Sequence, residues 1–259
     1  MHRSWSLTDL ELLALWEELG EQFLPDPLKF GRRTELWDEH LAQVRHAREA
    51  LDRDPALEEA LAAVHAADVR VELRGWDDRE WQLPEGTIRV LGARRGDLGY
   101  LLVQQPGETG VHSGGFTITE FYAEALADEL VAVLPEVTAG RGRDIVLADP
   151  EHTDDFEYAY DLSPAHETAE GTVVDRAADF LAVPATTAGT IDVVQGHSVF
   201  GPRGIVRYRL GYRDVQGDGR YLITNDVPPV ATSADRRRVS TAIDTLISEV
   251  LIAIDDERV

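Results

Sequence analysis

Residues 203–225 read RGIVRYRLGYRDVQGDGRYLITN, and this stretch decides the fold. Apolar and basic side chains alternate along its first part, with Val206, Tyr208, Leu210 and Tyr212 set against Arg207, Arg209 and Arg213. The alternation breaks at Gly217-Asp218-Gly219 and resumes with Tyr221 and Ile223. Alternation with a period of two predicts strands, and a short glycine-rich break between strands predicts a β-hairpin. The hairpin should therefore have one apolar face and one arginine face.

The neighbourhood of this hairpin occurs twice in the chain. The first copy has GTIRV at 86–90, strands at 98–105 and 115–119 and a helix at about 122–134; the second has GTIDV at 189–193, strands at 205–214 and 220–224 and a helix at about 234–254. Each copy reads β-β-β-α, a unit too short to bury its sheet alone. A chance match of the GTI-x-V pattern is the alternative to a true repeat.

This duplication predicts an α+β fold. Two β-β-β-α units should join as one pseudo-twofold body that shares a central antiparallel sheet, flanked by N-terminal and C-terminal helices. We expect a single domain over residues 1–259, with internal halves at about 1–137 and 138–259. A chain of this length buries a large core.

The remaining elements follow from periodicity and capping signals. A helix is expected at 7–19, where Ser6 and Asp9 resemble a capping box, and another at 175–181. A helix at 34–51 should have Leu36, Leu41, Val44 and Leu51 facing inward. A further helix should begin after Asp54-Pro55, with Leu57, Leu61 and Val64 facing inward. From Val69 the period becomes two, so Val69, Val71 and Leu73 should face away from Arg70, Glu72 and Arg74. A short strand is expected at 144–147.

Composition limits the function. The formal net charge is −23, which disfavours nucleic acid and anionic lipid as the main partners because the summed field repels polyanions. The chain has no cysteine, which excludes disulfides, thiol catalysis and cysteine-ligated metals and suits a reducing cytosol. No apolar run reaches the length of a membrane span, and the first residues lack the apolar core of a signal peptide. A cytoplasmic protein is expected.

Residues 149–170 contain eight acidic side chains and neither lysine nor arginine. Two prolines, Pro150 and Pro164, interrupt this segment. Such a composition does not favour a packed core, so we expect a mobile loop, in which the aromatic residues between Phe156 and Tyr160 could provide an anchor.

Motifs for catalysis or metal binding are weak. Asp214-x-Gln216-x-Asp218-Gly219 resembles the start of a calcium-binding loop, but its twelfth position is Asn225 and its flanks read as strands. His112-Ser113-Gly114-Gly115 is favoured as a strand connection over a nucleophile turn. His152 and His166 are interpreted as solvated loop histidines and not as metal ligands. No glycine-rich phosphate loop leads from a strand into a helix, so we expect no cofactor, no metal and no enzymatic activity.

The sheet surface is then the candidate functional region. In residues 98–105 apolar side chains occupy both faces of the predicted strand. Leu98, Tyr100 and Leu102 lie on one face, and Leu101 and Val103 lie on the other. Either helices cover both faces of this strand, or one face receives a partner.

The chain as a whole resembles the EspG family, the cytosolic chaperones associated with ESX (type VII) secretion in actinobacteria. The resemblance rests on the opening helix from Leu7-Thr8 to Gly20 with Leu15-Trp16, on Leu24-Pro25-Asp26-Pro27-Leu28, on Arg95-Gly96-Asp97 leading to Val103, on Gly217-Asp218-Gly219-Arg220-Tyr221-Leu222 and on Ser233-Ala234-Asp235-Arg236. It spans nearly the full length. The family's pseudo-twofold α+β body agrees with the duplication found in the residues.

The resemblance implies a non-enzymatic protein that binds the tip of a PPE-type substrate in a PE–PPE-like heterodimer, keeps it soluble and delivers it for export. Family contacts come from the central sheet and the C-terminal helical region. By position these correspond to strands containing Arg89, Leu101, Val103, Ile205, Arg207 and Arg209. The acidic segment departs from the family pattern and is interpreted as repelling clients of like charge. A self-associating scaffold and an uncharacterised hydrolase are the alternatives.

Overall fold

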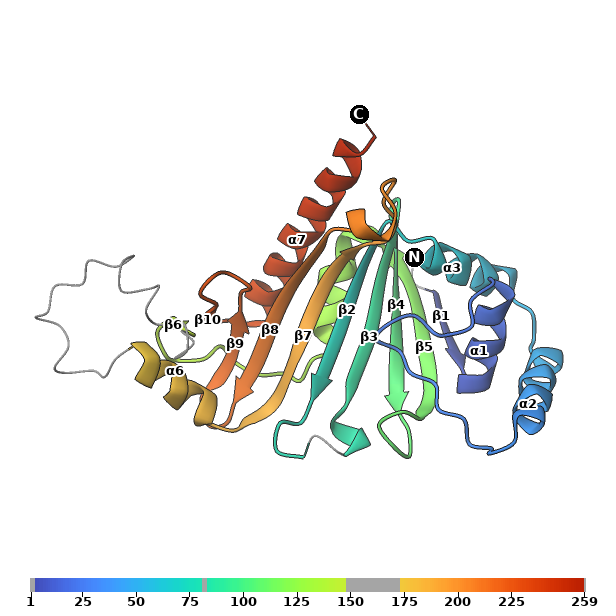
Figure 1. The fold of residues 1–259 in the computed structure, drawn as a ribbon, viewed down its shortest axis with the longest axis horizontal. Coiled ribbons are helices and arrows are strands. Elements are labelled where there is room, and N and C mark those ends of the chain that lie inside the picture. Colours follow the sequence, from blue (N-terminus) through green and yellow to red (C-terminus); the bar gives the residue numbers. More distant parts are fainter. Residues whose placement is uncertain (1–2, 81–82, 148–172, 259) are drawn as a thin grey trace, which may run out of the picture.

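The computed structural model describes residues 3–80, 83–147 and 173–258. One antiparallel sheet forms its centre, with strands in the order β1-β5-β4-β3-β2-β7-β8-β9-β10-β6 (Figure 1). Its strands are β1 Arg3–Leu7, β2 Val69–Trp76, β3 Ile88–Arg95, β4 Leu98–Pro106, β5 Ser113–Tyr122, β6 Ile145–Val146, β7 Ala185–Gln195, β8 Arg207–Val215, β9 Gly219–Ile223 and β10 Val230–Ser233. The helices are α1 Asp9–Glu18, α2 Trp37–Ala50, α3 Pro55–His65, α4 Leu126–Ala132, α6 Val173–Ala182 and α7 Arg236–Asp256. The α+β class is confirmed.

The strand order is symmetric about the β2–β7 pair. Moving outward from this antiparallel pair, β3 corresponds to β8, β4 to β9, β5 to β10 and the edge strand β1 to β6. Each half of the sheet therefore has five strands, two more than the predicted β-β-β-α repeat. The two GTI-x-V matches lie at β3 and β7, which are not equivalent positions, so this match does not mark the repeat. The division of a single domain into halves at about residue 137 stays an interpretation.

The hairpin at 207–223 is confirmed, with β8 and β9 paired antiparallel around Gly217. Gly217 has a φ of 78°, a left-handed conformation that glycine adopts without steric cost. Tyr212 lies opposite Leu222, and both side chains pack beneath α7. Tyr221 and Ile223 point to the other side of the sheet and pack near Phe180 of α6, so the second strand does not extend the apolar face through these two residues.

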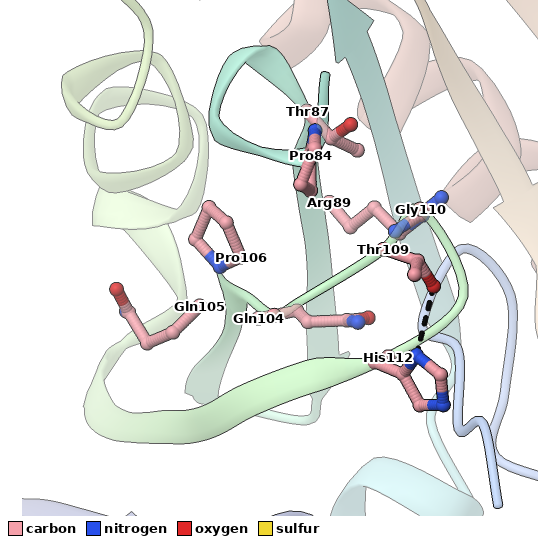
Figure 2. Close-up of a pocket in the computed structure, with 10 residues that line it drawn as sticks. Pro84, Thr87, Arg89, Gln104, Gln105, Pro106, Thr109, Gly110 and His112 are labelled. Carbon is pink, nitrogen blue, oxygen red and sulfur yellow. Dashed lines mark hydrogen bonds between the residues drawn. The ribbon is translucent and has the colours of Figure 1, made fainter. Parts of the chain in front are cut away.

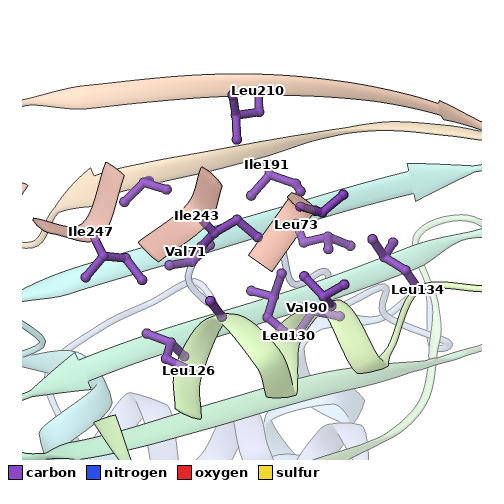
Figure 3. Close-up of a cluster of buried hydrophobic side chains, with 14 of the residues drawn as sticks. Val71, Leu73, Val90, Leu126, Leu130, Leu134, Ile191, Leu210, Ile243 and Ile247 are labelled. Carbon is purple, nitrogen blue, oxygen red and sulfur yellow. The ribbon is translucent and has the colours of Figure 1, made fainter. Parts of the chain in front are cut away.

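Helices α4 and α7 cover one face of the sheet, which we call the inner face (Figure 1). Side chains from the central strands meet the two helices in one buried cluster, in which Leu73, Ile191 and Ile243 have no solvent exposure (Figure 3). The predicted alternation in β2 places Val69, Val71 and Leu73 in this cluster. At about 1.5–3 kcal/mol for each fully buried aliphatic side chain, this layer supplies much of the favourable free energy of folding.

The other face, the outer face, is covered in two places. Helices α1 and α3 pack on β3–β5 through a cluster that includes Leu12, Leu57 and Leu102, and α6 packs near β9 and β10 through Phe180. Strand β4 is thus covered on both faces, because Leu101 belongs to the inner cluster and Leu102 to the outer one. Of the two alternatives for residues 98–105, the structure shows helices covering both faces of the strand.

Two N-terminal predictions are wrong. Residues 3–7 form an edge strand on β5, and α1 begins after Thr8, whose side chain forms the capping box with Glu11. The sequence signal at Ser6 and Asp9 was misleading because Ser6 lies in the strand, paired with Thr117. The helix expected at 34–51 is found as α2, which begins at Trp37, three residues later than predicted. Leu36 and Leu41, predicted to face inward, are exposed, whereas Val44 is buried as predicted.

The helix after Asp54-Pro55 is confirmed, with the Asp54 side chain accepting a hydrogen bond from the backbone N–H of Ala56. The short strand at 144–147 and the helix at 175–181 are also found, as β6 and α6. The acidic segment 149–170, with His152 and His166, lies outside the described residues. Within the described ranges, no helix is long and apolar enough to cross a bilayer.

Candidate functional site

The middle of the outer face carries polar side chains, and no helix of the described ranges covers it. Strands β2, β7 and β8 lie here, between the block of α1–α3 and helix α6 (Figure 1). We call this region the open face; its side chains are Arg70, Glu72, Arg74, Thr190, Asp192, Arg207 and Arg209. The alternation that sends Leu73, Ile191 and Leu210 to the inner cluster sends these residues to the opposite side.

Two buried carboxylates form the base of the open face. Glu72 and Asp192 lie directly opposite each other on β2 and β7, and their residues are 4% and 0% exposed. Like charges placed opposite each other in a sheet repel, and burial of a carboxylate without a counter-ion is costly. The arrangement is stable only if cations surround both acids.

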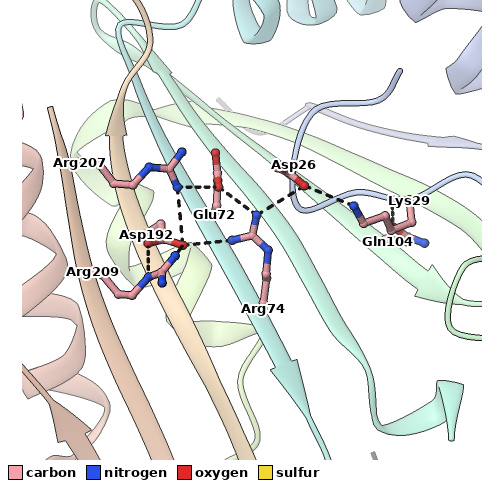
Figure 4. A network of polar contacts seen from close by, with 8 residues as sticks. All are labelled: Asp26, Lys29, Glu72, Arg74, Gln104, Asp192, Arg207 and Arg209. Atoms are coloured by element: carbon pink, nitrogen blue, oxygen red, sulfur yellow. Dashed lines mark hydrogen bonds and ion pairs between the residues drawn. The ribbon is translucent and has the colours of Figure 1, made fainter. Parts of the chain in front are cut away.

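Three arginines supply those cations (Figure 4). Arg74 donates to both acids, with Nη1 3.1 Å from Asp192 Oδ2 and Nη2 3.1 Å from Glu72 Oε2. Arg209 Nε lies 2.7 Å from Asp192 Oδ1, and Arg207 Nη1 lies 3.4 Å from Glu72 Oε2. The hydrogen bond and charge of Asp192 raise the pKa of Arg209 above its usual range. Each acid is therefore shared by at least two guanidinium groups.

The arginines remain accessible although they are paired. The side chains of Arg207 and Arg209 are 47% and 53% exposed, whereas the acids beneath them are almost inaccessible. The face therefore presents fixed guanidinium groups to solvent on a chain whose net charge is −23. Guanidinium groups already held in position lose little conformational freedom when they bind a second acceptor, which favours an acidic or polar partner.

Arg89 continues this face onto β3. It lies opposite Arg74 on one side and opposite Gln104 of β4 on the other. Burial, and after it the charge of Arg74, lowers the pKa of the half-buried Arg89 guanidinium. The loop before α2 also reaches this row, because the backbone N–H of Lys29 donates to Gln104 Oε1 at 2.8 Å and Asp26 lies 3.5 Å from Arg74 Nη2.

The structure brings together only some of the residues predicted to bind a partner. Arg89, Arg207 and Arg209 share the outer side of the sheet. Leu101 is buried in the inner cluster at 6% exposure, and Val103 packs against the same cluster. Ile205 precedes β8, at the end of a short 3-10 turn. The three apolar residues therefore do not extend the open face.

Sequence reasoning missed Glu72, Arg74 and Asp192 as parts of this site. The alternation in 69–74 placed the first two on a polar side, and Asp192 is an isolated acid within an apolar strand. A charged residue in such a strand is a signal for a buried counter-ion, because lone buried charges are unstable. The pairing of β2 with β7, which makes them neighbours, is not encoded in either segment alone.

The weak motifs have structural roles. Ser113 is buried, and its hydroxyl donates to Gly115 O at 3.0 Å while accepting from Gly115 N. His112 ends the connection between β4 and β5, as predicted, but Ser113, Gly114 and Gly115 already belong to β5. Asp214 pairs with Arg220 at 2.7 Å inside the protein, and Asp218 accepts from Tyr221 Oη at 2.6 Å. These carboxylates stabilise the β8–β9 hairpin. No group of three or more metal-ligating side chains is found among the described residues.

Comparison with known proteins places these features in context. The model of the EspG family matches residues 8–245. Among solved structures, the chain is similar to EspG5, a type VII secretion system chaperone of Mycobacterium tuberculosis, solved in complex with a PE25–PPE41 dimer. The TM-score is 0.58 at 12% sequence identity, with 97% of each chain covered, so this likeness shows a shared fold. No curated protein sequence matches the chain.

Proposed function

Because this chain belongs to the EspG family, we propose that it is a cytoplasmic, non-enzymatic chaperone that binds the tip of a PPE-type protein in a PE–PPE-like heterodimer. The match over residues 8–245 carries the proposal, because it includes every strand of the open face. The complex in which EspG5 was solved supports the choice of partner. In this role the chain shields the apolar tip and keeps the client soluble for export by a type VII secretion system.

The open face suits this role in shape and charge. A helical tip laid across β2, β7 and β8 would meet a rigid sheet without displacing any helix of the described chain. An interface of standard size buries about 800 Å² on each partner. Apolar contacts are available at the ends of the same strands, where Trp76 is 36% exposed and Phe200, in the β7–β8 loop, is 73% exposed.

The test is a titration of the purified chain against the PE–PPE pair of its own genome, by size exclusion and calorimetry. The wild-type chain should form a one-to-one complex with a Kd of about 1 µM or tighter, equivalent to about −8 kcal/mol. An Arg207→Glu/Arg209→Glu variant should bind at least about 100-fold more weakly, because reversal of central interface charges costs several kcal/mol.

The control is an Arg3→Glu/Arg45→Glu variant, which makes the same change in net charge at two exposed positions, on the edge strand β1 and on α2, away from the open face. It should bind as the wild type does. Circular dichroism establishes that each variant is folded. If the Arg207→Glu/Arg209→Glu variant still binds, the chaperone function stands but the contact surface lies elsewhere on the chain. A folded wild-type chain that binds no such pair would contradict the function.

A further inference from the structure

Arg89, on the outer side of the sheet, has no counter-ion among the described residues. Arg89 lies between Arg74 and Gln104 in the sheet, and the described residues give its side chain neither a hydrogen bond nor an ion pair. Its direct cross-strand neighbour Arg74 has the same charge, which destabilises the pair. By contrast, Arg74 itself contacts Glu72 and Asp192. Arg89 is therefore a half-buried cation that the fold leaves uncompensated.

A second donor beside Arg89 is also unsatisfied. Gln104 is only 5% exposed; its Oε1 accepts from Lys29 N, but its Nε2 is buried without a hydrogen-bond partner among the described residues. Figure 2 shows Arg89 and Gln104 on the wall of one small cavity of about 10 Å³. This volume is about the minimum for one water molecule. A water can accept hydrogen bonds from both donors, but it leaves the charge of Arg89 uncompensated.

A larger pocket opens on the other side of Arg89. It has a volume of about 380 Å³, and its walls include the cations Lys29, Arg74 and Arg89 and the apolar residues Pro27 and Trp76. Lys29 and Arg74 share Asp26 at 3.4 and 3.5 Å, so Arg89 is the cation in this wall that an incoming anion would neutralise. The combination of guanidinium and apolar wall fits a carboxylate on an aliphatic stem.

We propose that Arg89 binds the carboxylate of an aspartate or glutamate side chain at the tip of the client. The pocket shares Arg74 with the open face, so a client docked there reaches Arg89 without a second binding site. Trp76 contacts the stem of the acidic side chain, which selects a protein side chain over a free inorganic anion. This inference rests on the proposed chaperone function and specifies the chemistry of its partner.

The first experiment compares Arg89→Gln with Arg45→Gln in calorimetric titrations with the PE–PPE pair. Both variants remove one positive charge, but Arg45 is exposed on α2, away from the open face. Arg89→Gln should weaken binding by about 10- to 100-fold, the effect of losing a charged hydrogen bond, and Arg45→Gln should leave it unchanged. The melting temperature of free Arg89→Gln should stay the same or rise, because its removal relieves repulsion from Arg74. A purely structural arginine would instead lower it.

The second experiment identifies the acid. Each aspartate and glutamate of the client tip is changed to its amide, and each change is combined with Arg89→Gln in a double-mutant cycle. For one of these residues, the change to the amide should weaken binding to the wild-type chaperone. The same change should cause no further loss of affinity for the Arg89→Gln variant. Sodium acetate and sodium chloride are compared as free anions. Stabilisation by acetate that depends on Arg89, with no coupled client acid, would assign the pocket to a free carboxylate and overturn the proposal.

The two proposals fail in different ways. Wild-type binding that is insensitive to Arg89→Gln overturns the assignment of Arg89 and leaves the chaperone function intact. A folded wild-type chain that binds no PE–PPE pair overturns both, because the client carboxylate then has no source.

Discussion

The two faces of the central strands are built from alternate residues of the same segments, yet they are stabilised by different interactions. On the inner face, Ile191 packs without solvent exposure against the cluster beneath α4 and α7. One residue further along β7, Asp192 is equally buried, but its partners are Arg74 and Arg209. These two side chains are equally buried, but the partners of Asp192 include a guanidinium group, that of Arg209, which is exposed and can bind a second acceptor.

This difference separates stability from recognition. Apolar side chains on the inner face have their partners in α4 and α7, so nothing remains for a ligand to complete. On the open face, the buried acids fix guanidinium groups whose outer edges stay in solvent. Substitutions on the two faces should therefore change different measured quantities.

The largest effect on stability is expected from Ile191→Ala. Removal of a fully buried aliphatic side chain leaves a cavity, and the expected loss is about 2–5 kcal/mol in the free energy of unfolding. Urea denaturation followed by circular dichroism measures this loss. Thr190→Ala, on the outer side of the same strand, is the control and should change stability by less than about 1 kcal/mol. Equal losses in the two variants would contradict the assignment of the faces.

A smaller effect is expected from Asp192→Asn. The amide keeps the size of the side chain but removes the charge that holds Arg74 and Arg209, at an expected cost of about 1–3 kcal/mol. Relief of repulsion from Glu72 offsets part of this cost. Asp256→Asn, at an exposed position of α7, should leave the denaturation midpoint unchanged. Client affinity of the folded Asp192→Asn protein should also fall, because the arginines lose their fixed geometry.

The same contrast shows how far the sequence predicts the molecule. Alternation in 69–74 and 206–212 predicted which side chains share a face, since that depends only on the local backbone. It did not predict that Leu101 lies under helix α4 or that Glu72 meets Asp192, because these contacts depend on segments far away in the chain. The strand at 3–7 was missed for the same reason, because its pairing with β5 spans more than a hundred residues. The shared face of Arg207 and Arg209 was predicted because alternation within a strand is visible locally, whereas Arg89 was assigned by position from the resemblance to the EspG family. The contact role of all three stays a prediction.

The smallest effect is expected at the joint between the two faces. Glu257, at the end of α7, accepts hydrogen bonds from Gln195 Nε2 at 2.9 Å, Ser198 Oγ at 2.8 Å and Val199 N at 2.9 Å. It thereby ties the inner-face helix to the loop that leads into Arg207. These bonds, that of Gln195 first, hold the pKa of Glu257 below its ordinary value of 4.5. Their stabilisation is complete above pH 4.5 and is lost as the pH falls through the lower pKa of the folded state.

Acid should therefore release this loop before either face is disrupted. Hydrogen exchange at the Val199 amide should accelerate, relative to the intrinsic rate, as the pH falls below about 4.5. Glu257→Gln imitates the protonated carboxyl, so its Val199 amide should exchange faster at neutral pH and respond less to acid. The amide of Ile191 is the internal reference for β7. If Val199 and Ile191 lose protection together, the loop belongs to the cooperative unit of the sheet, and Glu257 does not form a separate joint.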